Sequence, residues 1–548
     1  MKKLSEKKYS SAKRNARKDS FILVTGISVI GMLIFRLVMS KQIGDIGMAC
    51  FGSTNEIYYV LAGTISFGLS EAAASLVRYR VRRDQYRSAQ RVLGGAVCIA
   101  GVLGVVLGLG ILFSAQLIAM KLLKFPIAGL SIAMMAPAVP FFLLTGVFRG
   151  YFQGNGSHIP AMHSLILQVI AVFAGGIAGA ALYKDYGTKV SALLQNADYT
   201  SAYGAKGASI GLLAASIVCF LHGLILYVIF RRNIRNQLGR EMSKNQDSRL
   251  YLLHMILGTG GIDALYWFLF HGVTLAGEII LFRFGGEAGT YAGQWGAYYA
   301  KTLALTGIVG EAVCMICLLS VRRIASLWDR DEYRTARERL GTLVHQCAVI
   351  VIPAAVLLAV LAENLLNVIF GGDNQQAAVW TQAGSTVVPL LVFSTIFMDI
   401  LLKSKKTSYA AGIGGTAFVL HGGVMFLLVN SGMGIMALII GSGVFYLVTA
   451  GAGFWIIMRG LQYRQEWIRT FAVTIVAAAI AGVAAMLLNK LFEPLLGPLL
   501  SMMICLIAAV AVYLLLLTIT RAFKDEELDE MAGGFLFRRL AELLHIMR

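Results

Sequence analysis

Three cations stand within apolar stretches of the sequence: Arg36, Arg283 and Lys301. A charged group in the middle of a membrane costs about 3 kcal/mol or more, so each of them requires a reason. Guanidinium and ammonium groups bind phosphate or carboxylate oxygens, and arginine can do so through two parallel hydrogen bonds. The three cations therefore predict a polar cavity that receives an anionic ligand. The alternative for Arg36 and Arg283 is snorkelling, since each lies in the outer part of its apolar stretch.

Carboxylates in the apolar stretches predict partners for the cations or a site for a coupling ion. They are Glu71, Asp263, Glu278, Glu311 and Asp399. Glu278 precedes Arg283 by little more than one helical turn and could neutralise it, or it could hold a proton or sodium ion. Glu71 and Glu311 could be interior partners or take part in coupling. Asp399, near Lys403, is expected at the cytoplasmic interface.

A glycine cluster predicts a bend in one apolar stretch. Gly258, Gly260 and Gly261 lie in residues 251–285, which form too long a stretch for one straight crossing. Glycines permit kinks, and discontinuous helices often mark transport sites. We therefore expect a bent helix that acts as a gate or hinge. The alternative is an interfacial helix that leads into an ordinary span.

The composition shows which elements must position these residues. Of the 548 residues, 57% are hydrophobic and 14% are charged, against about 45–50% and 25% in ordinary soluble domains. This excludes most soluble enzymes, disordered proteins and coiled coils. Apolar runs of about twenty residues predict an all-α integral membrane protein with fourteen spans. The expected spans are 21–40, 55–77, 92–118, 127–148, 159–183, 207–230, 251–285, 290–320, 343–370, 379–402, 409–430, 433–458, 470–489 and 495–520.

The distribution of basic residues predicts the orientation of these spans. The formal net charge is +19, and 38 of the 48 Lys and Arg residues fall in segments that the span order assigns to the cytoplasm. This is the excess that cytoplasmic loops carry. We therefore expect both termini in the cytoplasm and no role in nucleic-acid binding.

An internal repeat predicts two parallel lobes. Asp84-Gln85-Tyr86-Arg87-Ser88-Ala89 recurs 247 residues later as Asp331-Glu332-Tyr333-Arg334-Thr335-Ala336, and Phe35-Arg36 recurs as Phe282-Arg283 at the same offset. Val139-Pro140 recurs at 249 residues as Val388-Pro389, and both prolines are expected to bend their spans. The predicted organisation is a basic N-terminus (1–20), an N-lobe of six helices (21–230), a cytoplasmic linker (231–250), a C-lobe of six helices (251–458), two further helices (459–520) and an amphipathic cytoplasmic tail (521–548).

Motifs of metal or catalytic sites are missing from the sequence. The eight histidines are dispersed, and neither an HExxH motif nor a nucleophile elbow occurs. Cys314 and Cys317 form a CxxC within an apolar span, with no second pair. We therefore expect no catalytic residue, no metal site and no cofactor.

Two motifs resemble the multidrug/oligosaccharidyl-lipid/polysaccharide (MOP) exporter superfamily. The stretch 83–91, which reads RDQYRSAQR, is similar to the superfamily's cytoplasmic loop after its second span. The stretch 148–154, which reads FRGYFQG, is similar to the RGxFQG signature at the end of its fourth span. Within the superfamily, residues 20–520 most resemble the polysaccharide-synthesis branch, which includes stage V sporulation protein B-like proteins and lipid II flippases.

The resemblance implies a flippase of the bacterial cytoplasmic membrane. Its substrate would be an undecaprenyl-pyrophosphate-linked oligosaccharide, lipid II or another polysaccharide precursor, moved by alternating access. Arg36, Arg283 and Lys301 are the residues that could receive the pyrophosphate, and a proton gradient, a sodium gradient or the membrane potential could drive the cycle. Membrane lipids and cell-wall synthesis proteins are the implied partners. The alternatives are a cation-coupled multidrug antiporter of the same superfamily, a membrane-embedded polysaccharide polymerase, or a scaffold.

Overall fold

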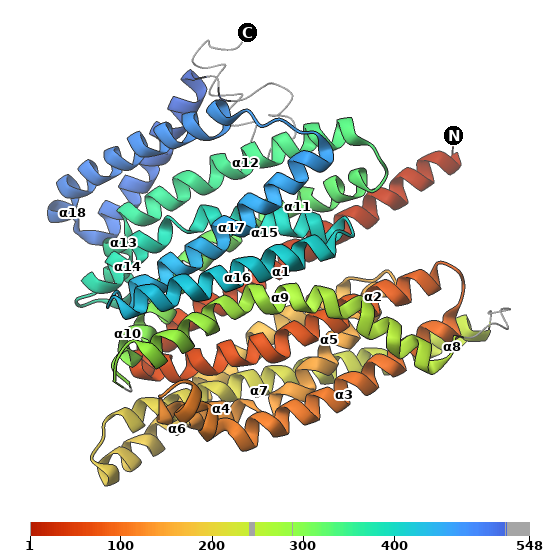
Figure 1. Cartoon of the computed structure of the whole chain (residues 1–548), viewed down its shortest axis with the longest axis horizontal. Helices are drawn as coiled ribbons and strands as arrows, with labels where there is room; N and C mark the ends of the chain where they lie inside the picture. The colour runs from red at the N-terminus through yellow and green to blue at the C-terminus, as the bar shows by residue number, and fades with distance from the viewer. Residues whose placement is uncertain (1, 240–246, 288, 521, 523–548) are drawn as a thin grey trace. The chain divides into compact units, whose positions relative to one another are not determined.

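The computed structural model describes residues 2–239, 247–287, 289–520 and 522, and the elements within these residues are helices (Figure 1). Hydrocarbon offers no water to backbone N–H and C=O groups, so a spanning chain must satisfy them internally. Among the described residues, ten helices are long and apolar enough to cross a membrane, or twelve if each of two bent helix pairs counts as one span. The predicted all-α membrane architecture is confirmed.

Two of these spans are each longer than a single crossing requires. Asp19–Val81 has 63 residues and Ile468–Ile519 has 52, whereas about 20 residues cross the hydrocarbon. Gly44 (φ 70°, ψ 179°) and Gly497 (φ 78°, ψ 168°) interrupt the helical backbone, with angles that are essentially restricted to glycine. Each span therefore contains two of the fourteen predicted spans, which accounts for the difference in number.

Packing divides the helices into two compact units: unit 1 (residues 1–300 and 414–434) and unit 2 (residues 301–413 and 435–548). Unit 1 contains α1 (Lys2–Tyr58), η1 (Tyr59–Gly63), α2 (Thr64–Val81), α3 (Tyr86–Leu117), η2 (Ile118–Leu122), η3 (Pro126–Ala128), α4 (Gly129–Met135), α5 (Ala138–Gly154), α6 (Ile159–Leu194), α7 (Asp198–Ile229), α8 (Arg231–Gly239), α9 (Arg249–Phe284), α10 (Ala292–Ala297) and most of α16 (Thr407–Asn430). Unit 2 contains α11 (Leu303–Trp328), α12 (Tyr333–Val360), α13 (Ala362–Phe370), α14 (Gln375–Ser385), α15 (Val388–Lys403), α17 (Ile435–Leu461), η5 (Ile468–Ala472) and α18 (Val473–Ile519), and η4 (Tyr298–Thr302) crosses the boundary.

Helix α9 belongs to unit 1 by its packing, although the sequence repeat predicts a C-lobe that begins at residue 251. A Cβ added to Gly260 of α9 would lie 2.6 Å from the backbone oxygen of Gly68 in α2, and a Cβ on Gly68 would lie equally close to the oxygen of Gly260. Such close contact requires glycine on both helices. The division by packing comes after Ala300, so it does not coincide with the lobe boundary that the repeat predicts.

The same glycines do not break α9. The helix continues from Arg249 to Phe284 without a non-helical residue, so the backbone is not interrupted there, and the bend stays a prediction. Gly260 provides the close contact with α2, while a Cβ on Gly258 or Gly261 would meet nothing within 4 Å. The cluster therefore permits helix packing here, and its predicted role as a gate stays a prediction.

Both copies of the repeated acidic motif form the same turn. Asp84 and Asp331 have φ values of 56° and 61°. Each carboxylate accepts a hydrogen bond from the tyrosine two residues later, at 3.0 Å from Tyr86 and 2.7 Å from Tyr333. Aspartate visits the left-handed region because its short side chain can bond locally. This shared geometry supports the predicted repeat.

The two prolines of the repeat stand beside two similar bends. The pair α4–α5 is bent by 45° and the pair α14–α15 by 42°. Pro140 and Pro389 lie in the first turns of α5 and α15, directly after each break. Proline has no N–H with which to continue a helical ladder backwards. The bends predicted for these two spans are confirmed.

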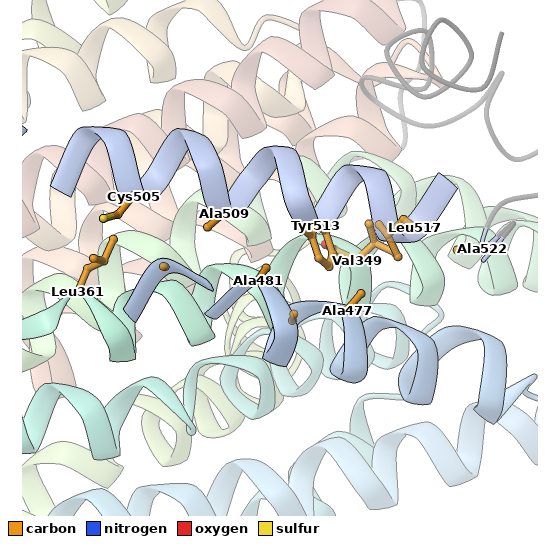
Figure 2. Close-up of a cluster of buried hydrophobic side chains, with 11 residues drawn as sticks. Val349, Leu361, Ala477, Ala481, Cys505, Ala509, Tyr513, Leu517 and Ala522 are labelled. Carbon is orange, nitrogen blue, oxygen red and sulfur yellow. The ribbon is translucent and has the colours of Figure 1, made fainter. Parts of the chain in front are cut away.

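Helix α18 packs against α12 and α13 through small side chains, as Figure 2 shows. Ala477, Ala481 and Ala509 form part of this buried cluster, and the Tyr513 hydroxyl donates a 2.8 Å hydrogen bond to the backbone oxygen of Val349. Pro353 lies four residues after Val349 in α12 and has no N–H to give to that carbonyl. Tyr513 therefore supplies the hydrogen bond that the proline removes. The predicted amphipathic tail, 521–548, lies outside the described residues apart from Ala522.

Candidate ligand-binding site

A carboxylate and an aromatic ring hold Arg36 inside unit 1. The Arg36 Nη2 atom lies 3.7 Å from Oε1 of Glu56, and the two side chains are only 17% and 11% exposed. The guanidinium carbon lies 4.1 Å from the centroid of the Tyr299 ring. A buried cation needs such partners, because it has lost its water.

The break at Gly44 brings Arg36 and Glu56 together. Along an unbroken helix, twenty residues would separate them by about 30 Å, at about 1.5 Å per residue. Because Gly44 is not helical, the two halves of α1 lie beside one another and the ion pair forms across them. Glu56 was not among the residues that the sequence predicted for the site. Its distance from Arg36 in the chain gives no sign of the contact unless the turn at Gly44 is recognised first.

The second half of α1 also positions Tyr299. Asn55 Nδ2 donates a 2.7 Å hydrogen bond to the Tyr299 hydroxyl oxygen. A Cβ on Gly52 would lie 2.9 Å from the ring, so the glycine leaves the space in which the ring sits. The ring is therefore fixed at its hydroxyl and along one edge. This gives the Arg36 guanidinium a rigid surface on which to lie.

Glu278 of α9 is fully buried in the same unit. The Ser53 hydroxyl, also on the second half of α1, donates a short hydrogen bond to Glu278 Oε1. The other oxygen, Oε2, and the indole Nε1 of Trp295 are buried without a hydrogen-bond partner in the described part of the chain. The Trp295 indole is a neighbouring hydrogen-bond donor toward this carboxylate, and the charge of Glu56 acts on it as well. Glu278 thus has acceptor capacity that the described residues leave unused.

Arg283 does not join this cluster. Its side chain is exposed, its Nη1 donates a 3.1 Å hydrogen bond to the backbone oxygen of Lys121, and the Lys124 ammonium donates to the Arg283 backbone oxygen at 2.9 Å. The predicted neutralisation by Glu278 is not formed, because Glu278 is bonded to Ser53 instead. The last turn of α9 directs Arg283 toward the backbone of η2, in keeping with the snorkelling alternative.

Lys301 lies in unit 2 among different partners. Its Nζ atom donates to Asn374 Oδ1 at 3.4 Å and stands 5.3 Å from the centroid of the Phe370 ring. Asn374 is oriented by its own hydrogen bond to the backbone oxygen of Gly371, at 2.8 Å. The ammonium group therefore has a neutral polar partner and an aromatic face.

The other predicted residues are dispersed. Glu71 of α2 is exposed, and Glu311 of α11 is partly buried. Asp399 forms an ion pair with Lys403, one turn later on α15. Within the described residues, no group of three His, Cys, Asp or Glu side chains is arranged to hold a metal ion.

The cluster of Arg36, Glu56, Tyr299, Ser53 and Glu278 can bind charged groups in two ways. The guanidinium could take an anion in place of Glu56, since the incoming anion and this carboxylate compete for the same positive charge. The free oxygen of Glu278 could take a proton or a small cation, because a buried carboxylate is strongly destabilised unless its charge is balanced. Within this cluster, the charge of Arg36 is balanced by Glu56, whereas Glu278 is bonded to a neutral hydroxyl.

Comparisons with known proteins identify the fold. No family model matches the chain. It is 23% identical over 400 residues to stage V sporulation protein B of Bacillus subtilis (strain 168), a match that covers 71% of this chain and 73% of the relative. The fold is similar to the lipid II flippase MurJ in an inward closed conformation, with a TM-score of 0.62, 14% identity and coverage of 91% of this chain and 98% of the flippase. An inward-facing multidrug resistance MATE family transporter of the MOP superfamily also has a TM-score of 0.62, at 14% identity, with 79% and 95% covered.

Proposed function

We propose that the chain is a membrane transporter of the MOP superfamily that moves a lipid-linked oligosaccharide across the bacterial cytoplasmic membrane, because it is similar to stage V sporulation protein B and its fold is similar to that of the lipid II flippase MurJ. The substrate would be an undecaprenyl-pyrophosphate-linked precursor of peptidoglycan or another surface polysaccharide. Alternating access would carry the headgroup through the protein while the prenyl tail stays in the lipid. Both termini would lie in the cytoplasm, as the excess of basic residues in the assigned cytoplasmic segments favours.

The observation that carries this proposal is the partly buried Arg36 with its carboxylate partner. Arg36 lies against Tyr299 and 3.7 Å from Glu56, in surroundings where a guanidinium binds phosphate oxygens strongly. The diphosphate would replace Glu56 on Arg36, so an empty site would keep its charges balanced. Lys301, held by the neutral Asn374, is a further candidate cation for the headgroup. Arg283 is left out, because its exposed guanidinium already bonds to a backbone carbonyl.

Glu278 is the candidate for coupling to a proton gradient, a sodium gradient or the membrane potential. It is buried, and one of its oxygens is unpartnered in the described part of the chain. A carboxylate in this position can alternate between a charged and a neutral form as it gains and loses a cation. Membrane lipids and proteins of cell-wall synthesis, which would supply the substrate and use it, are the proposed partners.

Reconstitution into liposomes tests the proposal directly. Wild-type protein should translocate a fluorescent undecaprenyl-diphosphate sugar, measured by the access of a membrane-impermeant quencher to the outer leaflet. Arg36→Gln should lower the rate about ten- to hundredfold, the value of one or two hydrogen bonds to a charged group. Arg283→Gln is the matched control and should keep most of the activity. No translocation by the wild type, or equal rates in the two variants, would contradict the proposal.

The unpartnered oxygen of Glu278 also favours a second candidate, a cation-coupled multidrug antiporter. In that case the acidic residues Glu56 and Glu278 would bind the organic cation or the coupling ion, and Arg36 would only balance Glu56. Proteoliposomes that accumulate ethidium in response to an imposed proton gradient, with loss of uptake in Glu278→Gln, would favour this function. The lipid-linked sugar would then not be translocated.

A further inference from the structure

Arg149 is the arginine of the FRGYFQG stretch, and it lies beside the packing surface of that motif. A Cβ on Gly150 would lie 2.1 Å from the backbone oxygen of Ser70, and one on Gly146 would lie 2.6 Å from that of Ser66. These glycines therefore allow α5 to lie directly on α2. The glycines explain the close packing of the motif. They do not explain why a charged residue stands among them.

Neutral groups of α6 are the hydrogen-bond acceptors for Arg149. Its Nε donates to the Ser164 hydroxyl oxygen at 2.9 Å, and its Nη2 donates to the Ser164 backbone oxygen at 3.2 Å and to Gln168 Oε1 at 2.9 Å. Within the described residues, no carboxylate forms an ion pair with it. The guanidinium is thus oriented but its charge is not neutralised, in contrast to Arg36 with Glu56.

The guanidinium lines a small cavity. The cavity is partly open and has a volume of about 10 Å³, the space of one water-sized group, and its lining includes Arg149, Thr145, Cys219 and His222 beside the ring of Phe148. The Thr145 hydroxyl donates to the backbone oxygen of Phe141 and the Cys219 thiol donates to that of Ser164, so the His222 imidazole is the donor that these lining groups offer. The cavity therefore presents one fixed positive charge beside an imidazole, where a single oxygen of an anionic group could bind.

Tyr59 connects this cavity with the Arg36 cluster. The positive charges of both Arg36 and Arg149 act on its phenol group, which also interacts with Gln168. Gln168 in turn accepts a hydrogen bond from Arg149. The two guanidinium groups therefore act on one intervening aromatic side chain within unit 1.

The second copy of the repeat lacks the charge. Phe148 corresponds to Phe397 at the offset of 249 residues, so Arg149 corresponds to Met398. Met398 is fully buried, and an apolar residue therefore serves the fold at this position of the bent helix pair. A cation that only one copy carries is better explained by a ligand than by folding.

We propose that Arg149 and its cavity form a second anion subsite, which binds a phosphate or another acidic group of the transported molecule. The inference rests on the proposed function and extends it: an acidic headgroup would contact Arg149 as well as Arg36. An anion can bind Arg149 without displacing an internal carboxylate, so this subsite would receive the headgroup before Glu56 releases Arg36.

Binding measurements with defined probes test this subsite. The probes are farnesyl diphosphate, farnesol and inorganic pyrophosphate, added to the full-length protein in detergent and followed by native mass spectrometry and tryptophan fluorescence. Arg149→Met introduces the residue of the second copy and should weaken farnesyl diphosphate binding at least about tenfold, while farnesol binding stays unchanged. Arg149→Lys keeps the charge without the planar pair of donors, so its affinity for farnesyl diphosphate should fall by less. The affinity of Arg149→Lys is the test if Arg149→Met does not fold. Arg334→Met, in the first turn of α12 at a highly exposed side chain, is the control and should bind like the wild type.

The possible outcomes separate the two proposals. In one outcome, Arg149→Met binds farnesyl diphosphate as tightly as the wild type, whereas Arg36→Gln loses this binding. That result would overturn the subsite and leave the proposed function unchanged. In a second outcome, the wild type binds farnesyl diphosphate and inorganic pyrophosphate equally well, and Arg149→Met binds neither. That result would support the subsite and reject a lipid-linked substrate. Failure of the wild type to bind either anion would overturn both.

Discussion

The two copies of the internal repeat share their backbone geometry but differ in their charged side chains. The acidic turn has the same left-handed residue and the same tyrosine–aspartate hydrogen bond in both copies, and the bent helix pairs differ by only three degrees. Each copy also joins its spans through two hydroxyl groups, Thr54 with Ser131 at 2.7 Å and Thr302 with Thr381 at 3.1 Å.

The charged side chains of the two copies follow no such symmetry. Arg36 is paired with Glu56, whereas its counterpart Arg283 is exposed and bonded to a backbone carbonyl. Arg149 corresponds to the buried Met398. Turns and bends depend on backbone angles that a few residues impose, so they persist when other side chains change. A cation in a membrane needs a particular partner, so it persists only where that partner is present.

The largest expected effect concerns the charge balance of unit 1. Glu56→Gln leaves Arg36 without its counter-ion and should lower the free energy of unfolding by about 3 kcal/mol, as expected for one partner removed from a buried pair. The double variant Glu56→Gln/Arg36→Gln should recover most of that loss. Thermal unfolding in detergent measures both. Arg283→Gln, whose exposed guanidinium bonds to the backbone oxygen of Lys121, should cost no more than about 1 kcal/mol. A similar loss at both sites would remove the contrast between the two copies of the repeat.

A second effect concerns helix packing that only one copy has. Gly68 corresponds to Met315 at the offset of 247 residues, so the contact between Gly68 and Gly260 has no counterpart. Gly260→Ala should destabilise the protein by about 1–3 kcal/mol because the new methyl group meets a backbone oxygen. Gly258→Ala, in open space, should be neutral or stabilise by up to about 1 kcal/mol. Unfolding curves and transport rates of both variants are the measurement. If Gly258→Ala instead lost transport activity while its stability stayed unchanged, the result would support the predicted hinge at this glycine cluster.

A third, smaller effect concerns α12, whose proline the first copy lacks. Pro353 corresponds to Val106 in α3. Tyr513→Phe removes the hydrogen bond to Val349 and should cost about 1–2 kcal/mol, because a buried carbonyl loses its donor. In a Pro353→Ala background the helical N–H is restored, and the same substitution should cost less. A double-mutant cycle on thermal unfolding gives the coupling. Zero coupling would show that Tyr513 acts independently of the proline.

A fourth effect, of about the same size as the third, tests the repeated turn itself. Asp84→Val and Asp331→Val each place a β-branched residue at a left-handed φ and remove the tyrosine hydrogen bond. Each should destabilise by about 1–2 kcal/mol. Asp84→Asn and Asp331→Asn are the matched controls, since asparagine tolerates the same backbone. Clearly unequal losses in the two valine variants would argue that the turns are not equivalent.

The fold was predictable from the sequence to a considerable extent. Apolar stretches of about twenty residues predict the spans because hydrocarbon thickness sets their length, and Pro140 and Pro389 predict the bends because proline cannot bond backwards. For Gly258 to Gly261 the sequence predicts a bend but not the packing. Glycine permits both, and only the tertiary structure shows that Gly68 lies opposite Gly260.

The sequence by itself determined that this chain is a multi-pass helical membrane protein with a repeated framework, because length, hydropathy and backbone preference are local properties. The tertiary structure decided which charges meet. Arg36 and Glu56 are neighbours only because Gly44 turns the chain between them, and Glu278 bonds to Ser53 rather than to the arginine one turn away. Ion pairing depends on distance in space and on exclusion of water, and neither can be inferred from separation along the chain.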